Sequence, residues 1–132
     1  MDARTVDIQT RIFSAQQLIT KFSVQDFENI WDNQDNCNLI ESMILRWPIG
    51  HFVFYGHDYC INGMSRFNAI KDFIEGKFAL TNLKYVETYN GLTFDQLPPW
   101  TQRNITEYDI DMKYIVNYCP LDVKYNLIAR FK

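Results

Sequence analysis

The residues best suited to chemistry form one short run, Asn62-Gly63-Met64-Ser65-Arg66. A glycine, a hydroxyl and a guanidinium stand together here, where hydrophobic spacing predicts that a helix begins. The backbone N–H groups and the dipole of a helix N-terminus favour an anion. A cation in the first turn opposes that dipole, so Arg66 is better explained if an anion binds beside it. The sequence therefore predicts a phosphate-binding site at this junction.

The same run also has a purely structural interpretation. Asn62-Gly63 would then be the positive-φ corner between a strand and a helix, and Ser65 would cap the helix. Arg66 would be a solvated residue of the first turn. Composition alone favours this interpretation, because isolated capped turns are common. The charge of Arg66 is the observation that favours the functional one.

Other candidate groups are weaker. His51 and His57 flank a predicted strand, but no acidic or cysteine cluster stands at ligand spacing around them, so we predict no metal site. Cys60 lies two positions before the loop rather than in it, which favours a buried thiol over a nucleophile. The aromatic residues are not interleaved with basic ones, and this is typical of a core rather than a base-stacking platform.

The whole chain has 132 residues, is 47% hydrophobic and 16% aromatic, and carries a formal charge of −3 at pH 7. These values predict a folded chain with one domain over residues 1–132. The acidic balance does not by itself require DNA as a partner. We find no apolar run of membrane-spanning length and no signal-peptide pattern. Three cysteines at unrelated spacings fit a reducing compartment. We therefore expect a cytoplasmic protein without a membrane partner, of an oligomeric state that the sequence does not indicate.

Hydrophobic periodicity predicts an α+β fold of short, interleaved elements. The predicted strands lie over residues 6–13, 52–55, 59–61 and 110–116. The predicted helices lie over residues 14–22, 39–46, 67–76, 98–107 and 120–131. Within this pattern, Asp35 or Asn36 is expected to cap the second helix after an irregular loop that begins near Ser23. Asn90-Gly91 predicts a further hairpin between residues 85–89 and 92–94.

Several segments together resemble a known family. Residues 39–49 read LIESMILRWPI, residues 62–78 read NGMSRFNAIKDFIEGKF and residues 90–98 read NGLTFDQLP. Their order and spacing resemble a branch of the ParB/sulfiredoxin-like superfamily, best known as the N-terminal domain of GmrSD-type modification-dependent restriction endonucleases. That branch carries an Asp-Gly-Gln-Gln-Arg signature and a helix ending Asp-Phe-x-x-Gly-Lys-Phe. Residues 127–132 resemble the start of a further family motif, so the resemblance runs from about Phe13 onward.

The resemblance implies a ParB/sulfiredoxin-like single domain, with a small mixed sheet and several packed helices. It also implies a nucleotide ligand, an NTP with Mg²⁺, or the phosphate of a nucleic acid. The residues that it marks for phosphate binding are Asn62, Gly63, Met64, Ser65, Arg66 and Arg130. The accessory residues that it marks are Trp31, Gly50, His51 and Asn68.

The chain departs from the family pattern at positions that matter for catalysis. Asn62 replaces the signature aspartate, and Met64 and Ser65 replace the two glutamines. In the upstream Tyr-Gln-Arg motif the arginine is replaced by Phe27, and only the following Trp31 is retained. Hydrolysis needs a metal-bound or base-activated water, so losing a carboxylate and a phosphate-binding arginine weakens it. We therefore expect a phosphate-binding module with weak or no hydrolysis.

A second function remains open from the sequence. The chain could be a catalytically degenerate protein-interaction module, encoded by a phage or mobile element, that binds or inhibits a restriction or defence complex. Its small size, acidic balance and eroded signature favour this alternative. An active NTPase or nuclease ranks last because of Asn62 and Phe27. A sulfiredoxin-like reductase is disfavoured because the loop contains no cysteine. Enzyme activity is thus left open, with its absence favoured.

Overall fold

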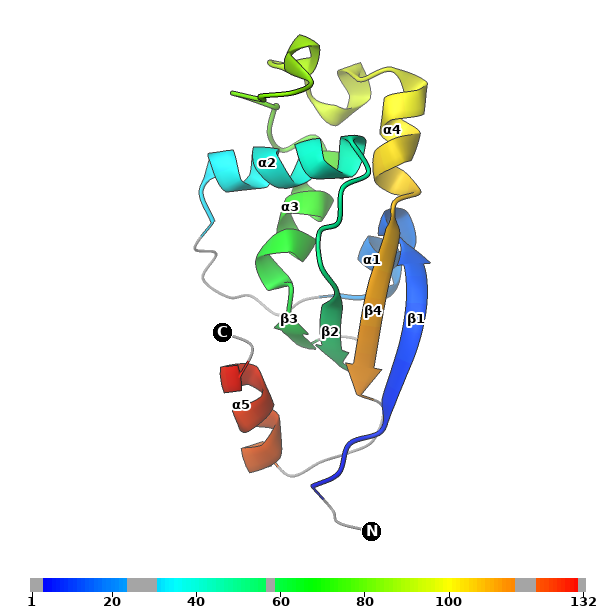
Figure 1. The fold of residues 1–132 in the computed structure, drawn as a ribbon, viewed down its shortest axis with the longest axis vertical. Helices are drawn as coiled ribbons and strands as arrows, with labels where there is room; N and C mark the ends of the chain where they lie inside the picture. The colour runs from blue at the N-terminus through cyan, green and yellow to red at the C-terminus, as the bar shows by residue number, and fades with distance from the viewer. Residues whose placement is uncertain (1–3, 24–30, 57–58, 116–120, 131–132) are drawn as a thin grey trace.

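One strand from late in the chain lies inside the sheet and joins its two halves. The computed structural model describes residues 4–23, 31–56, 59–115 and 121–130. Four strands form one mixed sheet in the order β1-β4-β2-β3 (Figure 1). Their bounds are β1 Ile8–Ser14, β2 Phe52–Tyr55, β3 Tyr59–Asn62 and β4 Asp109–Ile115. β4 pairs antiparallel with β1 and parallel with β2, while β2 and β3 form an antiparallel hairpin. The predicted α+β class with a small mixed sheet is confirmed.

The helices lie on both faces of the sheet in unequal numbers. Their bounds are α1 Ala15–Lys21, α2 Asn33–Ile44, α3 Met64–Ile74, α4 Pro99–Thr106 and α5 Leu121–Arg130. The first four contribute to the main core on one face. Leu127 of α5 instead packs on the opposite face, against a small cluster formed by Val53, Ile61 and Ile115. Figure 1 shows α5 apart from the other four helices, near the β3 end of the sheet.

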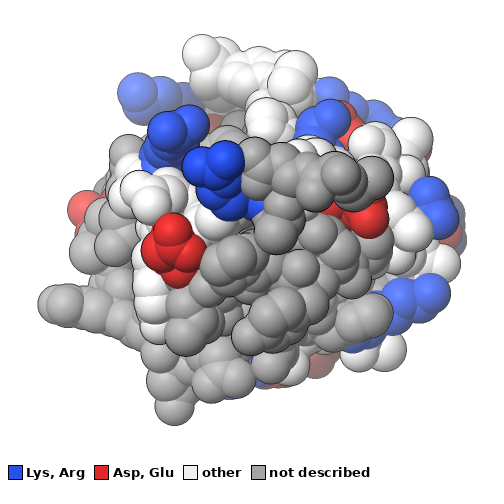
Figure 2. Space-filling model, turned by 90° about the horizontal axis from the view of Figure 1, so that it is seen from below, with Lys and Arg blue, Asp and Glu red and all other residues white. Residues whose placement is uncertain are grey.

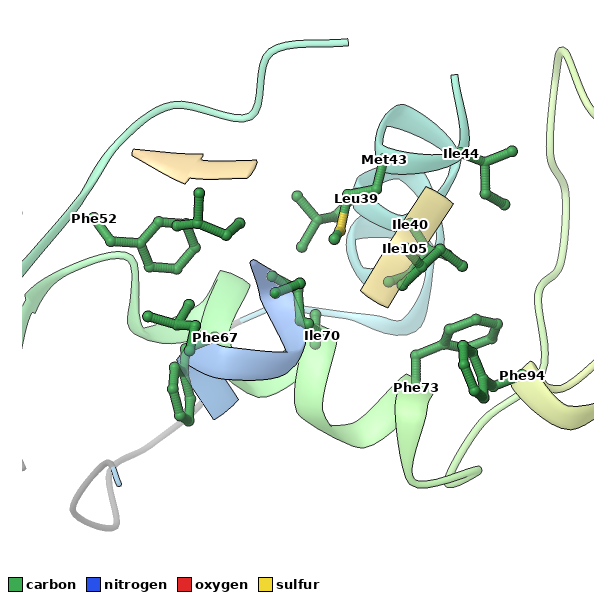
Figure 3. Close-up of a cluster of buried hydrophobic side chains, with 14 of the residues drawn as sticks. Leu39, Ile40, Met43, Ile44, Phe52, Phe67, Ile70, Phe73, Phe94 and Ile105 are labelled. Carbon is green, nitrogen blue, oxygen red and sulfur yellow. The ribbon is translucent and has the colours of Figure 1, made fainter. Parts of the chain in front are cut away.

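Alternation along β2 explains how the sheet serves two cores. Successive strand residues point to opposite faces. Phe54 therefore enters the main core, whereas Val53 enters the small cluster. Aromatic contacts extend the main core along α3: the Phe54 and Phe67 ring centroids lie 5.9 Å apart, and those of Phe73 and Phe94 lie 6.0 Å apart. Figure 3 shows this core between α2, α3 and α4.

Local interactions determine where α1 begins and where α3 ends. In the capping box of α1, Gln17 N–H donates to Ser14 Oγ at 3.1 Å and Ser14 N–H donates to Gln17 Oε1 at 3.0 Å. Gly76 ends α3 in the left-handed conformation, with φ +80°. Its N–H donates to the carbonyl of Phe73, as a helix C-terminal motif requires. The predicted start of a helix at residue 14 and the predicted end of a helix at residue 76 therefore agree with the structure to within two residues.

The predicted start of α2 was wrong. Residues 33–38, which we expected in a loop, are helical, and the remaining part of that loop from 24 to 30 lies outside the described residues. Asp32, rather than Asp35 or Asn36, caps the helix. Asp35 N–H donates to Asp32 Oδ1 at 2.8 Å, and Asp32 N–H donates to Asp35 Oδ2 at 3.2 Å. The helix begins early because these two aspartates satisfy each other's N–H groups reciprocally.

The hairpin predicted at Asn90-Gly91 was also wrong. Two short 3-10 helices flank this turn instead, η1 at Glu87–Tyr89 and η2 at Phe94–Gln96. Asn90 Oδ1 accepts a hydrogen bond from Leu83 N–H at 2.8 Å, and Gly91 N–H donates to Leu80 O at 2.6 Å. The turn therefore pairs with residues 80–83 rather than folding its own flanks into strands.

The charges of the described surface are mixed. Figure 2 shows basic and acidic side chains interspersed on the face seen from below. Lys77, which follows α3, pairs with both Asp72 and Glu75. This arrangement agrees with the formal charge of −3. Within the part of the chain that the structure describes, no helix has the length and apolar character needed to cross a membrane.

Candidate anion-binding site

Gly63 occupies the junction between β3 and α3 because no other residue fits there. Its φ is +110°, a left-handed conformation that L side chains rarely adopt. A Cβ at this position would lie only 2.6 Å from Cδ2 of Phe52. The ring of Phe52 is fully buried, so moving it aside would disturb the core. The glycine therefore allows the chain to turn tightly against this ring and to begin α3.

Gly63, and not Ser65, is the N-cap residue of α3, which corrects the structural interpretation of the sequence. No side chain caps this helix. The first bond of the helix runs from Phe67 N–H to Gly63 O at 2.8 Å. The backbone N–H groups before it belong to the first turn, which an α-helix leaves without intrahelical partners. These groups and the helix dipole make the start of α3 electropositive.

Arg66 fastens the segment before β2 to the first turn of α3. Its Nη1 donates to Ile49 O at 2.6 Å, and its Nη2 donates to His51 O at 3.0 Å. Gly50 lies between these two carbonyls, and a Cβ there would come within 3.1 Å of Nη1. The guanidinium also lies over the ring of Phe52, with Cζ 4.3 Å from the ring centroid. Arg66 is therefore held on three sides.

The charge of Arg66 lacks an acidic partner among the residues that the structure describes. Burial lowers the pKa of its guanidinium, and the nearby Cys60 opposes this effect. The groups that hold it are neutral carbonyls and an aromatic face. A guanidinium has more N–H donors than the two bonds to these carbonyls use. A half-buried cation with donors to spare is an anchor for an anion.

An open pocket of about 350 Å³ lies beside Arg66. Trp31 and Asp35 line it near the start of α2, and Asn38 and Ser42 line it further along the same helix. Apolar side chains of the α2–β2 connection complete the lining. The pocket therefore combines one cation, one carboxylate, an indole ring and neutral polar groups within reach of a small ligand.

The structure brings together only some of the predicted site residues. Arg66 and Trp31 line the pocket, and Gly50 and His51 lie directly against the Arg66 guanidinium. The contribution of His51 is its backbone carbonyl, because its side chain is exposed. The pocket therefore shares two residues, Ile49 and Arg66, with the clamp that the Arg66 guanidinium forms on the Ile49 and His51 carbonyls.

The other predicted residues do not line this pocket. Asn62, Met64 and Ser65 are half-buried at the β3–α3 junction, and Asn68 is half-buried one turn into α3. Arg130 is exposed near the end of α5, the helix whose Leu127 packs on the opposite face of the sheet. A ligand that used both Arg66 and Arg130 would have to reach around the β3 end of the sheet.

Cys60 is a buried structural thiol, as the sequence favoured. It is 2% exposed, and its Sγ donates to the carbonyl of Asn62 at 3.2 Å. Burial raises the pKa of Cys60 to about 12, although the positive charge of Arg66 acts in the opposite direction. The thiol is therefore neutral at physiological pH and cannot act as a nucleophile.

Sequence reasoning missed the role of Glu41. Its side chain is 5% exposed, and its carboxylate accepts the backbone N–H groups of Lys84, Tyr85 and Val86 at 3.4, 2.9 and 3.1 Å. These bonds anchor residues 84–86 to α2. The only signal in the sequence was an acidic residue within the apolar stripe of this helix.

Among the residues that the structure describes, no group of three or more histidine, cysteine, aspartate or glutamate side chains could hold a metal ion. Asp35 is the only acidic residue of the pocket lining. Comparison with known proteins finds no matching family model, no similar curated protein and no similar solved structure. The resemblance to the ParB/sulfiredoxin-like superfamily therefore stays a prediction that depends on the sequence motifs.

Proposed function

We propose that the chain is a nucleotide- or nucleic-acid-phosphate-binding module with weak or no hydrolysis. The observation that carries this proposal is the half-buried guanidinium of Arg66, which lines an open pocket and has no carboxylate partner among the described residues. A charge removed from water is costly unless an opposite charge or several hydrogen bonds compensate it. A phosphate oxygen in the pocket would complete that compensation.

The dimensions of the pocket suit a small phosphorylated ligand. Its volume of about 350 Å³ falls within the range of about 300–1,000 Å³ for small-molecule sites. The indole of Trp31 offers a surface on which a base can stack, and Asn38 offers a neutral hydrogen-bonding group. A single phosphate of a nucleic-acid strand would use the same cation. The formal charge of −3 favours a nucleotide over an extended strand, whose many phosphates require many cations.

We further propose that the fold is ParB/sulfiredoxin-like. Support comes from the placement of the motifs on the observed elements. The segment that resembles the family signature begins at the last residue of β3, continues through α3, and passes the helix-ending Gly76. The segment LIESMIL lies within the buried part of α2 and its end. Both motifs thus fall on elements that position the pocket.

The expectation of weak hydrolysis depends on Asn62. This residue supplies an amide where the family signature has a carboxylate, and a neutral amide holds Mg²⁺ and orients an attacking water less well. The variant Asn62→Asp tests that expectation. A gain of Mg²⁺-dependent NTP hydrolysis would show that this position silences the site, and an inactive, folded variant would show that it does not.

The binding proposal is tested by isothermal titration with each of the four NTPs, with and without Mg²⁺. Arg66→Ala should abolish binding, but it also removes the clamp on the Ile49 and His51 carbonyls. A second variant, Ser42→Tyr, keeps the clamp and fills the pocket. Gln16→Tyr introduces the same ring on the exposed side of α1 and is the matched control.

Binding that both pocket variants abolish and the control retains would support a phosphate site at Arg66. Binding that Ser42→Tyr leaves unchanged would place the ligand elsewhere. If none of the four NTPs binds the wild-type chain, the nucleotide proposal fails.

The alternative is the catalytically degenerate interaction module that binds or inhibits a restriction or defence complex. One observation favours it: several large hydrophobic side chains are exposed. These are Ile8, Ile12, Trp47, Tyr85, Trp100 and Tyr125. Exposed apolar groups that cluster often mark protein interfaces, and the rings of Trp47 and Tyr85 do pack together, with centroids 5.1 Å apart. If none of the four NTPs binds, the next measurement is a pull-down with the wild-type chain to find a protein partner.

A further inference from the structure

Among the strands that the structure describes, β1 has no partner on its outer edge. β1 is the first strand in the sheet order, so within the described chain it pairs on one side only, with β4 (Figure 1). The pairing is regular over all seven residues, from Ile8 opposite Ile115 to Ser14 opposite Asp109. A strand edge of this kind presents a row of N–H and C=O groups that can pair with another strand.

The other edge strand of the sheet, β3, is poorly suited to pairing with a further strand. β3 has only four residues, and a bulge interrupts its pairing with β2 between Val53 and Phe54. Short length and bulges are devices by which proteins prevent strands from adding to a sheet edge, as are proline and charged side chains on the edge strand. β1 is longer and has no bulge and no proline, and its one charged side chain is Arg11, which donates to the carbonyl of Thr10 at 3.1 Å. The protein thus blunts one edge and leaves the other able to pair.

The side chains of β1 are apolar where solvent would favour polar ones. Ile8 is 56% exposed and Ile12 is 69% exposed. Both lie on the face away from the main core, since they alternate with Phe13, which packs against it. Ile8 stands opposite Ile115, a member of the small cluster on that face. The apolar surface of this face therefore continues outward to the unpaired edge.

We propose that β1 pairs antiparallel with β1 of a second copy of this chain, about a two-fold axis at Thr10. In this register Ile8 lies opposite the partner's Ile12, and Ile12 opposite the partner's Ile8, so both exposed isoleucines gain an apolar neighbour. Gln9 lies opposite the partner's Arg11. Within one chain Gln9 Oε1 already accepts from Arg11 Nη2 at 3.0 Å and from Tyr114 Oη at 2.9 Å, so in the dimer Arg11 would exchange its intrachain bond for the equivalent bond to the partner's Gln9.

The occupant is a second copy because Ile8 and Ile12 lie symmetrically about Thr10, and neighbouring registers of the same pair are less favourable. An axis at Arg11 would place two guanidinium groups directly opposite each other, a destabilising arrangement. An axis at Gln9 would place Ile12 opposite Val6, which precedes the strand. Only the axis at Thr10 pairs both isoleucines within β1 and opposes the charged side chain with an acceptor.

The dimer leaves the Arg66 pocket untouched, because none of the residues that line that pocket belongs to β1. The inference therefore does not rest on the proposed function. An interface built mainly from one strand pair is small and buries a total of about 1,200 Å² of surface or less. We expect a dissociation constant of micromolar order.

Sedimentation equilibrium over a range of protein concentrations tests the dimer. Ile12→Lys should weaken dimerisation by about tenfold or more. In this variant each isoleucine pair of the interface becomes a pair of one isoleucine and one lysine cation. Trp100→Lys is the matched control: it replaces another exposed hydrophobic residue, 62% exposed on α4, and should leave dimerisation unchanged. Circular dichroism confirms that both variants are folded. A chain that stays monomeric up to about 1 mM, or a dimer that tolerates Ile12→Lys, would overturn the proposal.

A cross-link tests the axis itself. Opposed residues of antiparallel strands have Cα atoms about 4.5–5.5 Å apart, a separation that suits a disulfide. Thr10→Cys should therefore form an interchain disulfide on mild oxidation, visible as a dimer on a non-reducing gel. Thr20→Cys, exposed on α1, should not. Equal cross-linking of the two variants would exclude the two-fold axis at Thr10.

Discussion

The guanidinium of Arg66 lies over the ring of Phe52, with 4.3 Å between Cζ and the ring centroid. The same ring occupies the space that a Cβ at position 63 would need. One buried aromatic residue of β2 therefore fixes both the turn that begins α3 and the cation in its first turn. Because the positions of the glycine and the arginine depend on this ring, each can be tested by a substitution that changes one contact.

Arg66→Lys should lower the free energy of unfolding by about 1–2 kcal/mol. A lysine keeps the charge but cannot donate to the Ile49 and His51 carbonyls with the fixed fork of a guanidinium. Urea denaturation measures the change. Arg103→Lys, exposed on α4, is the control and should stay within about 0.5 kcal/mol of wild type. Equal effects at the two positions would show that the clamp contributes nothing to stability.

Gly63→Ala should destabilise the protein by about 2–4 kcal/mol, because backbone strain adds to a clash with Phe52. Gly91→Ala separates the two effects. Gly91 also has a positive φ, +86°, but a Cβ there meets no atom within 4 Å. Its substitution should cost only about 1 kcal/mol of backbone strain. If both variants have the same unfolding midpoint and slope, the contact with Phe52 is not the reason for the glycine.

Glu41→Gln should destabilise the protein by about 2–3 kcal/mol. In the wild type the carboxylate accepts hydrogen bonds from three backbone N–H groups. The amide replaces one acceptor oxygen with an NH₂ group, which is a donor and cannot accept from them. Hydrogen exchange should show the loss at Tyr85 and Val86 first. Glu107→Gln, exposed after α4, removes the same charge without a buried contact. Unchanged exchange rates at residues 84–86 would contradict the anchoring role of Glu41.

Cys60 should be unreactive in the folded protein. Its pKa of about 12 lowers the thiolate population at pH 8 by about 10³ relative to an ordinary thiol, and burial blocks access as well. Cys119 lies outside the described residues, so the assay uses Cys119→Ser. A colorimetric thiol reagent should label this variant in urea but not in buffer, because Cys37 is also buried. Rapid labelling in buffer would refute the buried assignment.

The raised pKa of Cys60 also sets a pH dependence. The folded pKa of about 12 lies above the unfolded value of 9.0, so the folded state holds this proton more tightly. The associated stability is fully present below pH 9 and is lost as pH rises toward 12, by at most about 1.4 kcal/mol per pH unit. Other groups titrate in this range as well. The measurement is therefore the difference in unfolding free energy between wild type and Cys60→Ala from pH 8 to 10.5, which should shrink as pH rises. A constant difference would argue against the shift.

The stretch from β2 to the end of α3 was predictable because its structure is encoded locally. Alternating aromatic and β-branched residues specify the hairpin, and apolar spacing with Gly76 specifies the helix and its end. The position of Arg66 in the first turn followed directly. Its partners did not, because the carbonyls of Ile49 and His51 lie 17 and 15 residues away in sequence. The sequence showed a cation at a helix start but not the clamp around it.

The segment around Asn90-Gly91 was mispredicted for a long-range reason. Local preference favoured two strands, but Glu41 accepts the N–H groups of residues 84–86 and leaves them unable to form a ladder. The Asn90 side chain likewise pairs with Leu83. Such competition between a distant carboxylate and local strand pairing is invisible in a single sequence. The pocket was missed because its lining comes from segments that are distant in sequence, namely α2, the connection to β2, and α3.

The place of β4 in the sheet has a consequence for how the protein is made. β1 and β2 are both synthesised long before residues 109–115, yet neither pairs with the other, and β4 joins them. A growing chain that ends before β4 can form the β2–β3 hairpin and α3 but has no partner for β1. Folding of the sheet therefore waits for the late arrival of its inner strand, and the earliest strand stays exposed during that interval.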